Sequence, residues 1–252
     1  DDRAAGSTDP PAVWFAYSPD RKGEHPVKHL REFSGVLQAD AYAGFEPLYV
    51  GERQPGRILE AACWAHARRK FYDIFVANKS PIAADALGRI GKLYEIEADV
   101  RGQSSTMRHE QRALRASPLL QALHAWLSST LTTVSKKSEL ANAIRYSLTR
   151  WPALTRYCEN GAIEIDNNIA ERALRGCALG RKNWLFAGSD AGGERAAAIY
   201  SLIGSAKLNG INPEAYLAYV IEHISEHQAK RIAELLPWNL ATLRQPEQRL
   251  AA

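Results

Sequence analysis

The feature that most constrains the fold is a change of hydrophobic pattern near residue 65. Residues 1–64 hold short apolar runs bounded by Pro, Asp or Gly, which predict strands in AVWFAYS, SGVLQAD and RILEAACW. From Ala65 to about Tyr157, apolar residues recur every three or four positions, which predicts helices. In PLLQALHAWL, one helix face would carry Leu119, Leu120, Leu123, Trp126 and Leu127. Strands followed by a long helical block are typical of an insertion into an α/β unit.

The last hundred residues are also predicted to be mostly helical. Asn209 and Gly210 form a helix stop, and Asn212 followed by Pro213 predicts the N-cap and first turn of the next helix. Pro237 would end the helix in AKRIAELL, and RQPEQRLAA has the composition of a frayed tail. We therefore expect three parts: a partial sheet in 1–64, a helical insertion in 65–157 and a helical C-terminal region in 158–252.

The amino-acid composition excludes several classes of protein. Hydrophobic residues make up 46% and charged residues 24% of the 252, which excludes a chain that is disordered along most of its length. No apolar run approaches the roughly 20 residues that cross a bilayer, and DDRAAGSTDPP does not resemble a signal peptide. Three irregularly spaced cysteines make a poor disulfide framework. These features predict a cytoplasmic protein with free thiols and no membrane contact.

Two basic clusters stand beside aromatic residues, in HARRKF and GRKNW. The formal net charge of +4 is modest, so it is compatible with a polyanionic partner but does not require one.

Asp40 follows the predicted strand GVLQ, where the chain turns into a loop. Open α/β sheets place ligands and chemistry at the carboxyl ends of their strands, so Asp40 is a candidate ligand or catalytic group. The alternative is that Asp40 caps the next helix, because Asp is a favoured N-cap residue. Spacing alone favours the cap.

Glu171 has a similar pair of interpretations. If Asn168 is an N-cap, Glu171 occupies the return position of a capping box and Arg175 is its partner one turn later. Against this, Asp166 and Asn167 also precede the turn and supply more side-chain oxygens than one cap needs. Glu194, which opens the following helix, is a rival acid, and local sequence does not separate the two glutamates.

Cys63 and His66 have the two-residue gap of half a zinc site, but Cys158 and Cys177 are isolated and supply no second half. On a helix, Cys63 and His66 would share one face, with Arg68, Arg69 and Lys70 around the next turn. The alternative is a basic helix face that is simply solvated.

Taken together, several stretches resemble the catalytic region of bacterial transposases of the insertion sequence sixty-six family. They are GVLQADAYAGF, AACWAHARRKFYDIF, ELLPWN and the long run from EIDNNIAERALRG through CALGRKNWLFAGSDAGGERAAAIYSLIGSAKLNGINPEAYL. The resemblance covers nearly the whole chain and is weakest from about Ser80 to Leu140. It implies an α/β fold with a ribonuclease-H-like catalytic core, a large helical insertion and a helical C-terminal region.

The resemblance also assigns the carboxylates. The family belongs to the DDE transposases, in which two Asp and one Glu hold divalent metal for DNA strand cleavage and transfer. Its second Asp falls on Asp40 and its Glu on Glu171, which separates Glu171 from Glu194. Ligation by oxygen alone suits Mg²⁺ or Mn²⁺. Asp40 and Glu171 would then be metal ligands and not proton-transfer groups.

The resemblance implies double-stranded DNA as partner, at insertion-sequence ends and target, and a homo-oligomer acting on it. Trp64 or Trp184 would be available to stack on an unpaired base. Cys63 and His66 match a Cys-x-x-His motif found near the catalytic strands of several DDE groups. The basic residues expected to contact phosphates are Arg68, Arg69, Lys70, Arg172, Arg175, Arg181 and Lys182.

One departure from the family pattern affects activity. The first catalytic Asp of the family lies upstream of the segment that matches DDR at the start of this sequence, so neither Asp1 nor Asp2 is assigned to it. We therefore expect an N-terminally truncated, incomplete core, and a chain that is catalytically inactive alone. One alternative is a non-catalytic nucleic-acid-binding protein, and another is an interaction domain without DNA affinity.

Overall fold

The computed structural model describes residues 1–180, 182–183 and 187–240. Contacts group the chain into two units. The sheet unit consists of Asp2–Ser7 and Arg21–Ile169, and the C-terminal unit consists of Asp1, Thr8–Asp20 and the chain from Ala170 onward. The prediction of three parts, 1–64, 65–157 and 158–252, stays a prediction.

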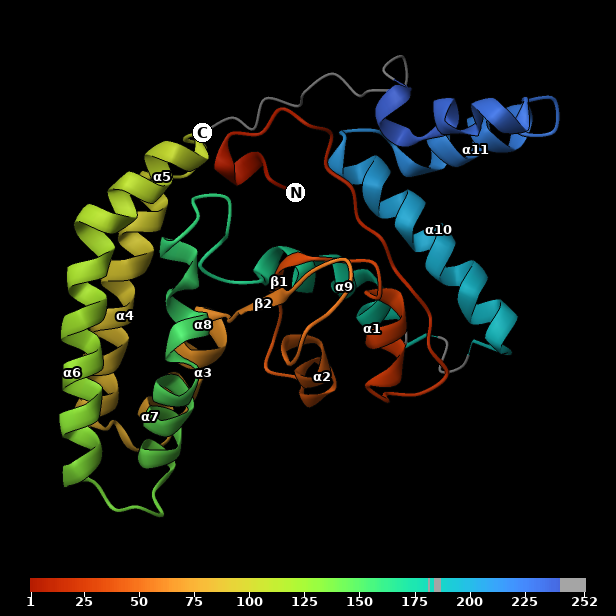
Figure 1. Ribbon diagram of the computed structural model, residues 1–252. Coiled ribbons are helices and arrows are strands. Elements are labelled where there is room, and N and C mark those ends of the chain that lie inside the picture. Colours follow the sequence, from red (N-terminus) through yellow and green to blue (C-terminus); the bar gives the residue numbers. More distant parts are fainter. Residues whose placement is uncertain (181, 184–186, 241–252) are drawn as a thin grey trace. The chain divides into compact units, whose positions relative to one another are not determined.

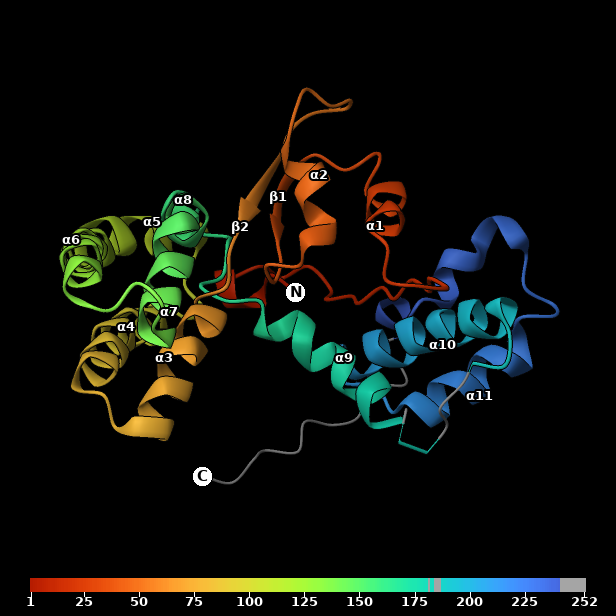
Figure 2. The same ribbon diagram turned by 90° about the horizontal axis from the view of Figure 1, so that it is seen from below.

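The sheet unit contains a two-stranded parallel sheet, β1 (Gly35–Gln38) and β2 (Ile58–Ala61). Gly35 pairs with Ile58 and Gln38 with Ala61, so both strands end at the same edge. A short helix α1 (Glu24–His29) precedes β1, and a 3₁₀ turn, Ala43–Phe45, leads into α2 (Glu46–Tyr49). Helix α2 packs beside β2, as Figure 2 shows.

A bundle of helices follows β2 (Figure 1). Its helices are α3 (Trp64–Asn78), α4 (Pro81–Asp99), α5 (Ser105–Gln111), α6 (Ser117–Thr133), α7 (Glu139–Thr149) and α8 (Trp151–Thr155). A π-helical turn, Arg112–Ala116, joins α5 to α6, and a 3₁₀ turn, Arg156–Cys158, follows α8. This region is helical as the spacing predicted, and Leu120, Leu123 and Leu127 are buried on the predicted face of α6.

Serine side chains cap the N-termini of two of these helices. Ser80 and Ser138 accept hydrogen bonds from backbone N–H groups in the first turns of α4 and α7. Such caps satisfy donors that have no partner within the helix. The apolar faces then meet in one core, which continues to the sheet through Ala61 and Ala62. Helix α8 packs against β2, so the bundle supports the edge at which both strands end.

The C-terminal unit contains most of α9 (Asn168–Gly180), together with α10 (Asp190–Leu208) and α11 (Pro213–His223). Two 3₁₀ segments follow, Ala229–Leu235 and Pro237–Asn239. The predicted helix stop and start are confirmed: Gly210 has a left-handed φ of 72°, and Asn212 Oδ1 accepts from the N–H groups of Glu214 and Ala215.

The strand predicted for AVWFAYS is wrong. Residues 12–17 have no regular secondary structure and instead pack along α10. The Val13 N–H donates to Ser205 Oγ at 3.1 Å, and the Phe15 N–H donates to Ser201 Oγ at 2.8 Å. Helix hydroxyls thus replace a neighbouring strand as hydrogen-bond acceptors, which explains why an apolar, strand-like run lies outside any sheet.

The observed architecture is mostly helical with one small parallel sheet, which agrees with an α/β assignment at that level. The ribonuclease-H-like core implied by the resemblance stays a prediction. Within the described part of the chain, every helix is too short or too polar to cross a bilayer.

Candidate functional site

Asp40 lies at the carboxyl edge of the parallel sheet. It follows β1 by two residues, and the intervening Ala39 is buried and donates its N–H to the carbonyl of Ala61 at 3.3 Å. Pairing therefore continues one residue beyond β1, and the exposed Asp40 comes directly after the last paired position. This is the position at which parallel sheets present functional groups to solvent.

The Cys63 and His66 pair lies at the same edge, because β2 runs parallel to β1 and ends at Ala61. Cys63 is buried at the N-terminus of α3, and His66 is half-buried in the first turn. Burial raises the pKa of the Cys63 thiol, and a hydrogen bond with the backbone of Asn167 opposes that rise. The structure thus brings Asp40 and the Cys-x-x-His motif to one edge of the sheet.

The segment that precedes Glu171 is attached to this edge. The Trp64 N–H donates to the carbonyl of Ile165 at 3.1 Å, and Gln38 Nε2 donates to the carbonyl of Glu164 at 2.5 Å. Arg108 Nη2 donates to the carboxylate of Glu164 at 2.5 Å from a buried position. Strand β1, helix α3 and helix α5 therefore all hold residues 164–165.

Asp166 determines how α9 begins. Its carboxylate accepts from the Tyr94 hydroxyl at 3.0 Å, from the backbone N–H of Asn168 at 3.1 Å and from Asn168 Nδ2 at 2.8 Å. Asn168 is the first residue of α9, so the alternative in which Asn168 is the N-cap does not hold. Its own backbone N–H donates to Asp166, because Asp readily bonds to the N–H two residues on.

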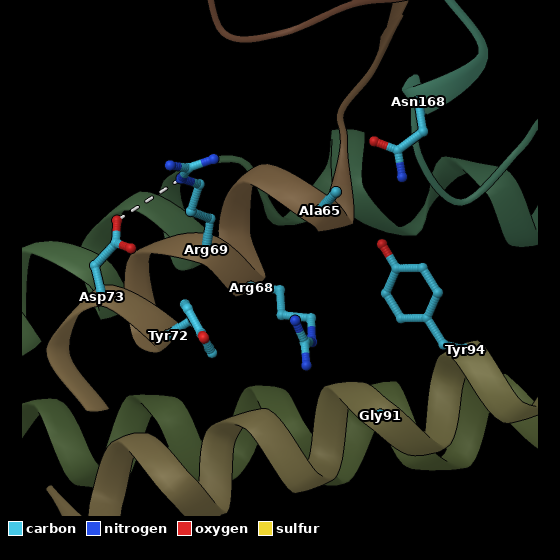
Figure 3. Close-up of a pocket in the computed structure, with 8 residues that line it drawn as sticks. All are labelled: Ala65, Arg68, Arg69, Tyr72, Asp73, Gly91, Tyr94 and Asn168. Atoms are coloured by element: carbon cyan, nitrogen blue, oxygen red, sulfur yellow. Dashed lines mark ion pairs between the residues drawn. The ribbon is translucent and has the colours of Figure 1, made fainter. Parts of the chain in front are cut away.

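A pocket of about 580 Å³ lies between α3 and α4, as Figure 3 shows. Its lining residues are Ala65, Arg68, Arg69, Tyr72, Asp73, Gly91, Tyr94 and Asn168. Arg69 pairs with Asp73 at 3.9 Å, whereas Arg68 has no hydrogen bond or ion pair with any residue that the structure describes. Two of the predicted phosphate contacts therefore line a cavity whose wall also includes Ala65, the residue before His66.

The third basic residue of α3 lies beside a different ring. Lys70 Nζ is 4.5 Å from the centre of the Tyr146 ring, and Arg150 Cζ is 4.9 Å from the same centre. Burial raises the pKa of Tyr146; the Arg150 cation opposes this, and negative charge at Asp40 adds to it. The Tyr146 ring thus lies beside two cations and within the field of Asp40, although no sequence motif indicated this residue.

The C-terminal unit carries the remaining predicted residues. Glu171, Arg172 and Arg175 are exposed on α9, and Glu194 is exposed on α10. Lys182 is exposed in the turn after α9, whereas Arg181 and Trp184 lie outside the described residues. Asp40 and Glu171 belong to different units, so their pairing in one site stays a proposal.

Trp64 is not available to stack on a base. Its side chain is 0% exposed, and Nε1 donates to the carbonyl of Leu154 at 2.8 Å. An indole with its only donor satisfied inside a core is a packing residue. The prediction that Trp64 contacts DNA is therefore wrong.

Comparison with models of known protein families shows which family this chain belongs to. The model of the transposase IS66 family matches residues 1–195, and that of the IS66 C-terminal element matches residues 201–238. The chain belongs to the IS66 transposase family. The resemblance inferred from GVLQAD, CWAH and NNIAER is thereby confirmed.

IS66-like relatives include long and short proteins. The uncharacterized protein y4hP of Sinorhizobium fredii is 42% identical over 250 residues, which cover 94% of this chain and 45% of that relative. The uncharacterized protein y4jD of the same organism is 40% identical over 243 residues, covering 95% of this chain and 48% of that protein. The uncharacterized protein YuaK of Escherichia coli K12 is 49% identical over 50 residues, covering 20% of this chain and 53% of that protein. The chain spans about half the length of the long relatives, and no solved structure matches it significantly.

Proposed function

We propose that this IS66-family chain is the C-terminal catalytic part of a DDE transposase that cleaves insertion-sequence DNA and transfers its strands. The observation that carries this proposal is the position of Asp40. It is an exposed carboxylate at the carboxyl edge of a parallel sheet, in a chain that the family model matches through residue 195. The spacing argument that Asp40 merely caps a helix has less support, because the next helical turn begins only at Ala43.

The donor chemistry fits a divalent cation. Asp40 and Glu171 are both exposed carboxylates, and carboxylate oxygens are preferred ligands of Mg²⁺ and Mn²⁺. We assign these two residues as ligands of Mg²⁺ or Mn²⁺. Bound there, the cation would activate the attacking oxygen and stabilise the leaving oxygen of an in-line displacement at a phosphodiester.

The chain's own residues would bind and orient the DNA. Exposed guanidinium and ammonium groups on α3 and α9 attract phosphates regardless of sequence, which fixes the position of the backbone relative to the carboxylates. The attachment of residues 164–166 to β1, α3 and α4 fixes the start of the helix that carries Glu171. The resemblance assigns two of the DDE carboxylates to Asp40 and Glu171, and we propose that the chain acts on DNA as a homo-oligomer.

Metal binding tests the assignment. Mn²⁺ affinity would be measured by electron paramagnetic resonance for the chain and for Asp40→Asn, Glu171→Gln and the control Glu194→Gln. We expect the first two changes to weaken Mn²⁺ binding by about tenfold or more and the control to leave it unchanged.

DNA binding would be measured on the same variants over a range of salt concentrations. A non-catalytic nucleic-acid-binding protein would bind duplex DNA with a steep salt dependence and show the same Mn²⁺ affinity in all four forms. That outcome would overturn the catalytic assignment. An absence of salt-dependent duplex binding would instead indicate an interaction domain.

A further inference from the structure

The pocket between α3 and α4 has two kinds of wall. One is cationic, from Arg68 and Arg69, and the other is aromatic, from Tyr72 and Tyr94. Figure 3 shows Arg68 between the two tyrosine rings, with Asn168 at the rim. We propose that this pocket binds one unpaired nucleotide of a DNA strand, with the phosphate on Arg68 and the base against tyrosine. The inference rests on the proposed function and names the form of DNA that this pocket takes.

The charge arrangement selects Arg68 as the phosphate contact. Asp73 pairs with Arg69 and so reduces its attraction for an anion. Arg68 is exposed, lies one residue earlier on the same helix, and has no such partner among residues 1–180, 182–183 and 187–240. A guanidinium presents several donors in a fixed plane, which matches two oxygens of one phosphate. Ligand phosphate would therefore satisfy donors that the folded chain leaves to solvent.

The two tyrosine rings of the pocket are suited to stacking on a base, because one ring is fixed in position and the other is exposed to solvent. Tyr94 is fixed by its hydrogen bond to Asp166, whereas the side chain of Tyr72 is 48% exposed. Every nucleobase has a π-face, so stacking on tyrosine tolerates any sequence. The volume of about 580 Å³ lies within the range of small-ligand sites, which admits one nucleotide but not a duplex. A base must therefore leave its pair to enter.

Asn168 connects the pocket with the proposed catalytic segment. Its Nδ2 donates to Asp166, which leaves its side-chain oxygen as an acceptor at the rim for an amino group of a base. Asn168 is also the first residue of the helix that carries Glu171. A nucleotide in the pocket would thus lie beside the segment that positions a proposed metal ligand, and this relationship favours a nucleotide of the DNA substrate as the occupant.

The test compares a fluorescein-labelled oligothymidylate with a labelled duplex, by anisotropy on the full chain. Tyr72→Ala is the main variant because its exposed ring can be removed without opening the core. We expect it to weaken single-strand binding by about 5- to 160-fold, the range of one stacked base, and to leave duplex binding unchanged. Tyr72→Phe keeps the ring and should bind like the original chain. Arg68→Gln should weaken single-strand binding more than Arg101→Gln, which removes an exposed cation outside the pocket.

The outcomes separate this inference from the proposed function. If Tyr72→Ala lowers the affinity for duplex and single strand equally, or lowers neither, the nucleotide pocket is overturned. Salt-dependent duplex binding by the original chain would still support the proposed DNA-binding role. Failure of the original chain to bind either DNA would overturn both. Thymidine monophosphate is then added as a competitor at the same concentration as the oligonucleotide. If it displaces the oligonucleotide, the pocket selects a free nucleotide, which would overturn the assignment to a DNA strand.

Discussion

Arg112 and Glu97 form a buried, bidentate ion pair. Arg112 Nε and Nη2 donate to the two carboxylate oxygens of Glu97 at 2.8 and 2.6 Å, and the side chains are 0% and 9% exposed. The remaining guanidinium nitrogen donates to the carbonyl of Tyr157 at 2.7 Å. The pair joins α4 to the π-helical turn and to the 3₁₀ turn after α8. Glu97 also accepts from Arg108 Nη2 at 3.5 Å, and Arg108 binds Glu164, so the pair supports the residue that holds Glu164 in place.

Removing one partner of this pair should be strongly destabilising. Arg112→Ala leaves the Glu97 carboxylate buried without its main partner, so we expect the free energy of unfolding to fall by about 3–5 kcal/mol. Urea denaturation followed by circular dichroism measures the change. The matched control is Arg31→Ala, which breaks an exposed pair with Glu32 and should cost less than about 1 kcal/mol. Equal losses in the two variants would show that the buried pair is no more important than a surface one.

The Cys158 thiol should make stability depend on alkaline pH. Burial raises its pKa to about 11 from an ordinary value of 9. Because the fold favours the neutral thiol, this stabilisation is fully present below about pH 9 and is lost as the pH rises from about 9 to about 11. In that window, the free energy of unfolding falls by up to about 1.4 kcal/mol for each pH unit.

The measurement is the difference in unfolding free energy between the original chain and Cys158→Ala. The variant lacks the titrating thiol, so the difference should shrink between about pH 9 and about pH 11. Groups that do not contact Cys158 titrate in both proteins and cancel in the comparison, and burial holds the pKa of the neighbouring Tyr157 well above its ordinary value of 10. A constant difference across this range would show that Cys158 has an ordinary pKa in the folded chain.

Trp64→Phe should affect stability and not DNA binding. The change leaves the carbonyl of Leu154 without its indole donor inside the core, which should cost about 1–3 kcal/mol. Anisotropy with duplex DNA should give an unchanged affinity, because the ring is inaccessible to any base. A variant of unchanged stability and weaker DNA affinity would place Trp64 in the interface after all.

Gly204→Ala should release the segment that packs along α10. A Cβ at Gly204 would overlap the Val13 side chain, whereas one at Gly88 would meet no atom within 4 Å. We expect Gly204→Ala to speed proteolysis within residues 8–20, as seen by mass spectrometry of the fragments. Gly88→Ala in α4 is the control and should instead stabilise the chain by up to about 1 kcal/mol. Unchanged proteolysis in Gly204→Ala would mean that the segment accommodates the methyl group in place.

The sequence predicted those parts of the fold that depend on neighbours along the chain. Asn212 and Pro213 begin α11 because the cap and the fixed φ act within one turn. The apolar face of α6 was predictable because helical spacing brings Leu120, Leu123 and Leu127 together in any helix. These signals need no knowledge of the tertiary structure.

The predictions that the structure contradicts concern residues whose hydrogen-bond partners could not be read from the local sequence. Residues 12–17 have the composition of a strand, but their hydrogen-bond acceptors are Ser201 and Ser205 of a helix. Asn168 could be an N-cap by its residue type, but it is the first residue of α9 and its N–H donates to Asp166. At the candidate site, Asp40 and the basic turn of α3 could be selected from sequence, whereas Tyr94 and Tyr146 could not. Their roles depend on Asp166 and Lys70, which lie far from them along the chain.

The packing of residues 12–17 on α10 also has a consequence for how the chain is made. Val13 and its partner Ser205 are 192 residues apart. At about 5–20 residues per second, a ribosome needs roughly 10–40 s to add the residues between them. During that interval, while the sheet unit is being synthesised, residues 12–17 lack the serine hydroxyls that later accept their hydrogen bonds. We therefore expect this segment to stay exposed on the nascent chain until α10 has been synthesised, and to remain exposed in a protein terminated before Ser205.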